Sequence, residues 1–87
     1  MSNTLISPMA MASRLTALLY APDVHQDAYE PVHIVASGPD GITDGWSVWF
    51  RHHGRYAEVT YSMHDLSLTM DEFAERHLHD AARLLLG

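Results

Sequence analysis

Apolar and polar residues alternate one by one through the middle of the chain, as they do along strands that bury one face. In residues 46–52, for example, Trp46, Val48 and Phe50 share one face, while Trp49 lies on the other. The same alternation recurs on either side of this segment, and turn-forming residues separate the three stretches. The strands predicted in this way are residues 31–37, 46–52 and 55–62.

Helical periodicity marks the regions on both sides of these strands. Ser7 and Pro8 are typical of a helix start, with a hydroxyl as the N-cap and proline in the first turn. Thr69 and Glu72 have the spacing of a capping box, in which each side chain bonds the backbone amide of the other residue. The alternative start for this C-terminal helix is Ser67. The predicted helices cover residues 8–20 and 70–86.

This order of helix, three strands and helix predicts a single α+β domain spanning residues 1–87. We expect two layers: a three-stranded antiparallel sheet, and both helices on one of its faces. Turn signals at residues 38–41, 44–45 and 53–54 favour short connections between the strands. The predicted core consists of Leu15, Leu18, Trp46, Val48, Phe50, Val59, Phe73, Leu78 and Leu85.

The charge balance narrows the range of partners. The chain has eleven carboxylates, five arginines and no lysine, and its formal charge is −6 at pH 7. Such a surface repels nucleic acid and anionic membranes and attracts basic proteins. The chain has no cysteine, which excludes disulfides and thiolate chemistry. Its N-terminal residues lack the basic character of a signal peptide, so we expect a cytoplasmic protein with no membrane segment.

The element order resembles that of the double-stranded RNA-binding domain. In that family, lysines at the start of the second helix bind phosphates across the groove. The matching positions here are Met70, Asp71, Glu72 and Glu75. Carboxylates at these positions repel phosphate, and phosphate neutralisation supplies most of the affinity for nucleic acid. We therefore expect no nucleic-acid partner.

The histidines and serines do not form a complete chemical site in the sequence. Two histidines are adjacent at residues 52–53, and two are separated by one residue at 77–79, whereas metal ligands on a helix need a spacing of three or four. Ser62, His64 and Asp65 lie close together, but a catalytic triad must converge in space, and strand ends and caps explain these residues better. We expect no enzyme, no metal and no cofactor.

Two kinds of surface are candidates for contact with a partner. Trp49 and Tyr56 lie on the outward face of the predicted sheet, and aromatic side chains dominate interface hot spots. Alternatively, a helix or a second copy of the chain covers that face. The other candidate is acidic, with clusters in the loop of residues 22–30, around the turns and along the last helix. The acidic candidates are Asp23, Asp27, Glu30, Asp40, Asp44, Asp71, Glu72 and Glu75.

In its size, negative charge and lack of a catalytic motif, the whole chain resembles phage-encoded anti-CRISPR proteins. These are short, frequently acidic proteins that block basic nucleic-acid-binding surfaces of Cas proteins. The resemblance implies a DNA-mimicking inhibitor in the host cytoplasm, bound to a basic partner such as a Cas subunit, and it assigns no role to any single residue. The alternative is a phage or bacterial accessory subunit, or a homodimer that associates through Trp49 and Tyr56. Both a monomer and a homodimer fit the sequence.

Overall fold

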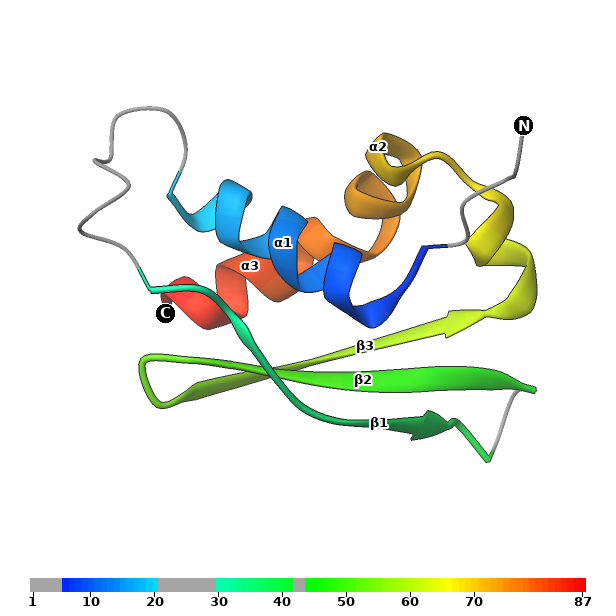
Figure 1. The fold of residues 1–87 in the computed structure, drawn as a ribbon, viewed down its shortest axis with the longest axis horizontal. Coiled ribbons are helices and arrows are strands. Elements are labelled where there is room, and N and C mark those ends of the chain that lie inside the picture. Colours follow the sequence, from blue (N-terminus) through cyan, green and yellow to red (C-terminus); the bar gives the residue numbers. More distant parts are fainter. Residues whose placement is uncertain (1–5, 21–29, 42–43) are drawn as a thin grey trace.

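The computed structural model describes residues 6–20, 30–41 and 44–87 (Figure 1). The elements in chain order are α1 (Pro8–Leu19), β1 (His33–Pro39), β2 (Gly45–His52), β3 (Arg55–Ser62), a 3-10 helix (Met63–Ser67), α2 (Met70–Phe73), a π-helical segment (Ala74–Leu78) and α3 (His79–Leu86). The strands form one antiparallel sheet in the order β1-β2-β3. The helices lie together on one face of this sheet, which confirms the predicted α+β fold (Figure 1).

Helix α1 begins as its sequence predicts and is tied to the sheet through a buried hydroxyl. The Ser7 hydroxyl accepts a hydrogen bond from the amide of Ala10 at 3.1 Å, and Pro8 occupies the first turn. Farther along, Thr16 Oγ1 donates to the carbonyl of Ala12 and accepts from the amide of Val32, both at 2.9 Å. The hydroxyl therefore both donates and accepts, and it holds Val32, the residue before β1, against the helix.

The β2–β3 hairpin has the predicted turn at His53 and Gly54. Both residues have positive φ, 50° and 78°, as a two-residue type I′ turn requires. The turn sets the register in which Val48 pairs with Val59 and Phe50 with Ala57. The side chains of these pairs are buried beneath the helices.

Strand β1 differs from its prediction in bounds and register. It covers His33–Pro39 rather than residues 31–37, and a bulge interrupts its pairing with β2. Ile34 pairs with Phe50 but Ala36 pairs with Trp49, so Val35 is the extra residue. The alternation predicted for this strand therefore fails after Ile34, because the bulge turns Ala36 to the outer face of the sheet.

Most of the predicted core is buried, with two corrections. The alternation predicts Trp46 inside, but this residue is 39% exposed. It shares the inward direction of Val48 and Phe50 but lies near the end of β2, where it pairs with Pro39 and Tyr61 in the last rows of the sheet. Leu18 is only partly buried, at the edge of the core. The remaining predicted core residues, Leu15, Val48, Phe50, Val59, Phe73, Leu78 and Leu85, are buried.

The C-terminal helical region starts at the predicted capping box. The amide of Glu72 donates to Thr69 Oγ1 at 3.2 Å, and the amide of Thr69 donates to Glu72 Oε1 at 3.0 Å. The sequence predicts one continuous α-helix from Met70, whereas the structure has a π-helical segment in its second turn. Hydrogen bonds of the π type join residues five apart, so this segment brings Phe73 and Leu78 onto the same buried face.

The capping box generates the first testable prediction. The variant Thr69→Ala should lose about 1 kcal/mol of unfolding free energy, the usual cost of removing a capping hydroxyl. Chemical denaturation followed by circular dichroism measures this loss. Thr69→Ser is the matched control, because it keeps the hydroxyl and should stay close to the parent protein. An equal loss in both variants would show that the hydroxyl does not stabilise the helix start.

Candidate interaction surface

The side of the sheet that faces away from the helices carries exposed aromatic side chains. We call this side the open face; its central residues are Trp49 and Arg51 on β2 and Tyr56 and Glu58 on β3. Trp49 is 41% exposed and Tyr56 is 52% exposed. All the described helices lie on the other side of the sheet (Figure 1). Their predicted outward position is confirmed, and a large exposed aromatic group is a recurrent mark of an interaction surface.

Strand pairing places these four side chains in two adjacent rows. Arg51 lies directly opposite Tyr56, and Trp49 lies directly opposite Glu58. On its other side Trp49 pairs with Ala36, whose small side chain leaves the indole uncovered. The two aromatic residues are thus diagonal neighbours, as are the two charged residues. Among the described residues, neither Arg51 nor Glu58 has an ion-pair partner.

Two of the predicted acidic residues, Asp71 and Glu72, already have partners within the helical layer. Asp71 Oδ1 lies 2.7 Å from a guanidinium nitrogen of Arg14, which joins α2 to α1. Glu72 closes the capping box, and its bonds to the Thr69 amide and hydroxyl hold the pKa of Glu72 below its usual value. Asp23 and Asp27 lie outside the described residues.

The other predicted acids lie on separate elements. Glu30 precedes β1, and its Oε2 lies 3.7 Å from Nδ1 of His53. Asp40 and Asp44 flank the β1–β2 connection, where the amide of Asp40 donates to the carbonyl of Gly45 at 2.8 Å. Glu75 is exposed on the helical layer. In the part of the chain that the structure describes, the predicted acids therefore do not converge on one contact surface.

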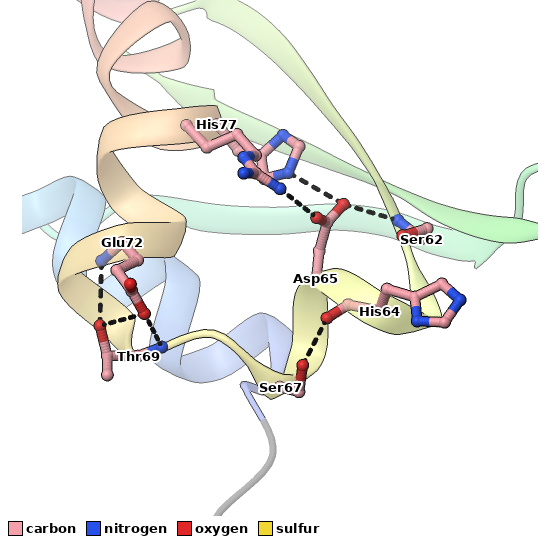
Figure 2. A network of polar contacts seen from close by, with 8 residues as sticks. Ser62, His64, Asp65, Ser67, Thr69, Glu72 and His77 are labelled. Carbon is pink, nitrogen blue, oxygen red and sulfur yellow. Dashed lines mark hydrogen bonds and ion pairs between the residues drawn. The ribbon is translucent and has the colours of Figure 1, made fainter.

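Asp65 is the centre of a polar network that the sequence did not predict (Figure 2). Its carboxylate accepts from the amide of Ser62 at 2.9 Å and from Arg76 at 3.1 Å, and it lies 3.1 Å from Nε2 of His77. Burial raises the pKa of Asp65, but the hydrogen bond from the Ser62 amide, the charge of His77 and the hydrogen bond from Arg76 outweigh it and hold the pKa below its usual value. Asp65, the carboxylate of the Ser62, His64 and Asp65 combination noted in the sequence, thus links the end of β3 to the helical layer.

A second polar cluster joins the end of α1 to the β2–β3 turn. The Tyr20 hydroxyl lies 2.7 Å from Nε2 of His52 and 3.1 Å from Nε2 of His53. His52 is nearly buried, at 6% exposure. Burial lowers the pKa of His52, and the neighbouring charge of His53 lowers it further. Spacing along the chain could not reveal this cluster, because its residues are 32 and 33 positions apart.

The direction of each hydrogen bond in this cluster depends on the tautomers of the two imidazoles. The Tyr20 hydroxyl has one proton, so it can donate to only one of His52 and His53. Nδ1 of His53 lies 3.7 Å from Oε2 of Glu30. The lowered pKa of His52 favours the neutral form of that ring.

An open groove of about 490 Å³ lies between α1 and the start of α2. Its polar side chains include Arg14 and Thr69, which are engaged by Asp71 and Glu72 respectively. Catalytic pockets instead gather free ionisable groups. The apolar part of the lining consists of Ile6, Ala10, Ala17, Leu68 and Met70.

Other classes of site find no support in residues 6–20, 30–41 and 44–87. No three histidine, aspartate or glutamate side chains there come together as metal ligands. No helix of this described part is long and apolar enough to cross a membrane. Comparisons with protein-family models, curated proteins and solved structures find no match. Function must therefore be inferred from the chain's own surface, where the open face is the most distinctive feature.

The histidine cluster predicts how stability depends on pH. Because the pKa of His52 is lowered in the folded protein, the unfolded chain binds the proton first as the pH falls below the ordinary value of 6.5. The stability that His52 contributes is present above that pH and is lost as the pH falls through its folded pKa. We expect the unfolding free energy to drop between about pH 7 and pH 5, before carboxylates such as Asp65 are protonated.

Denaturant unfolding at a series of pH values measures this dependence. The variant His52→Gln should flatten the curve between about pH 7 and pH 5, whatever its effect on stability at pH 7. His79→Gln is the control, since His79 is exposed on α3. Equal slopes for the parent and the His52 variant would show that protonation of His52 is not coupled to unfolding.

Proposed function

We propose that this protein works by binding another protein, with the open face as its contact surface. One observation carries the proposal: Trp49 and Tyr56 are exposed diagonal neighbours on a sheet face that no described helix covers. The solvated face of an antiparallel sheet ordinarily carries polar side chains. Tryptophan, tyrosine and arginine are the residue types enriched in interface hot spots, and the centre of the open face has all three.

A second form of the proposal is an inhibitor of the anti-CRISPR type, which would occupy a basic nucleic-acid-binding surface of a Cas complex. The net charge of −6 and the absence of lysine support it. Glu75 and Asp44 are exposed carboxylates with no ion pair among the described residues. Against this, Asp71 and Glu72 already have intramolecular partners. The observations therefore favour the aromatic open face over an acidic mimic.

Site-specific photocrosslinking tests the open face even while the partner is unidentified. Tyr56 is replaced by p-benzoylphenylalanine, a larger photoreactive aromatic residue that the exposed position can accommodate, and the protein is irradiated in the cells that express it. Leu84 is the matched control position, because it is an exposed apolar residue on α3. We expect a discrete adduct from position 56 and none from position 84, with mass spectrometry identifying the attached chain. No adduct from position 56 would contradict the proposal.

Charge reversal and salt separate the two forms of the proposal when a Cas complex is the test partner. For the acidic mimic, changing Asp23, Asp27 and Glu30 to lysine should weaken binding without unfolding the domain. Raising the salt from about 0.05 to about 0.5 M should also slow association, because the Debye length falls from roughly 14 to roughly 4 Å. Binding measured by surface plasmon resonance that ignores both changes, yet is lost with Trp49→Ala, would reject the acidic mimic and support the open face.

A further inference from the structure

The four central side chains of the open face form a pattern that is complementary to itself. Arg51 lies opposite Tyr56, and Trp49 lies opposite Glu58. Neighbouring strands are about 4.8 Å apart, and residues two apart on one strand are about 6.8 Å apart. The four positions are thus the corners of a rectangle. One diagonal joins the two aromatic rings, and the other joins two opposite charges.

We propose that the partner of the open face is a second copy of this chain, related by a twofold axis along the aromatic diagonal. This inference rests on the proposed function, because it names the occupant of the same surface. Such an axis stacks Trp49 on Trp49 of the partner subunit and Tyr56 on Tyr56 of the partner subunit. It also exchanges the two charged corners, so that each Arg51 faces Glu58 of the partner subunit.

The geometry of this arrangement is compatible with the ways in which sheets pack. With the spacings above, the lateral offset between Arg51 and Glu58 of the partner subunit is roughly 3 Å, well within reach of two long side chains. The strands of the two sheets then cross at roughly 70°, closer to the orthogonal class of sheet packing than to the aligned class. Any dimer with closed twofold symmetry must be self-complementary in this sense.

Charge accounts for the choice of a second copy over an unrelated partner. Arg51 and Glu58 have no ion pairs within the described part of the chain. A basic partner would satisfy Glu58 but would be repelled by Arg51, whereas a second copy satisfies both. The −6 charge of each copy opposes association, but ordinary salt screens it beyond about 8 Å, while the contacting pairs are screened less.

The available area predicts a weak, reversible dimer. Three strands of about eight residues present a face of roughly 14 by 27 Å, but two such faces whose strands cross at roughly 70° overlap over only about 200 Å². A stable interface of standard size buries about 800 Å² on each partner. The dimer is therefore expected to dissociate on dilution, with the exposed Val35 beside the central rows adding apolar contact at the rim.

A charge-swap experiment on the purified full chain tests the axis. Sedimentation equilibrium from about 5 to about 500 µM, in about 0.15 M salt, should show a concentration-dependent dimer. Arg51→Glu and Glu58→Arg should each weaken dimerisation about tenfold or more, and the double variant should return to within about threefold of the parent. Glu75→Arg is the matched control, because it makes the same charge change on the helical layer. Trp49→Ala should abolish the dimer.

Each outcome decides between specific alternatives. A parent protein that stays monomeric over the whole range overturns the second copy, while an adduct from position 56 to a different protein would still support the open face as a contact surface. A dimer that the double variant fails to restore, or that Glu75→Arg weakens equally, overturns the proposed axis. Circular dichroism and thermal unfolding at low concentration verify the fold of each variant. If a reversal unfolds the chain, the neutral variants Arg51→Gln and Glu58→Gln replace it, each with a smaller expected loss.

Discussion

Burial on one side of the sheet is the constraint on which the rest of this structure depends. A three-stranded sheet needs a packed layer on at least one face to be stable. The helices provide that layer over Val48, Phe50 and Val59, all buried within 2% exposure. None of the described segments covers the opposite face. Everything that points outward from β2 and β3 is therefore at the surface, which makes the aromatic residues there the feature that calls for a functional explanation.

The charges of the helical layer have a different role from those of the sheet. Asp71 pairs with Arg14, and Asp65 joins Arg76 and His77 to the end of β3, so these charges connect elements of the fold. The exposed Arg14–Asp71 pair contributes little stability by itself, but it orients the two helices that carry it. Once such pairs are accounted for, a high content of carboxylates is weaker support for an acidic contact surface than the sequence alone indicates.

Much of the fold could be predicted because its signals are local. The Thr69–Glu72 box, the His53–Gly54 turn and the alternation in β2 all act over a few residues. The β1 bulge left no signal, because residues 34–36 are all apolar and satisfy either register. Alternation also placed Trp46 on the correct side of its strand, but it could not show how far along the strand the helices extend. The outward position of Trp49 was predictable, whereas the contacts of Tyr20 with two distant histidines were not.

The type I′ turn at His53 and Gly54 connects the fold to the candidate surface. A hairpin turn of fixed length sets the register of its strands, and a slip of one residue would turn every side chain to the opposite face. In that case Trp49 and Tyr56 would compete with Phe50 and Ala57 for the core. The register set by the turn therefore determines both which side chains are buried and which are exposed. The same register that closes the core also sets Arg51 diagonal to Glu58, so the charge pattern of the open face is a direct consequence of how the hairpin folds.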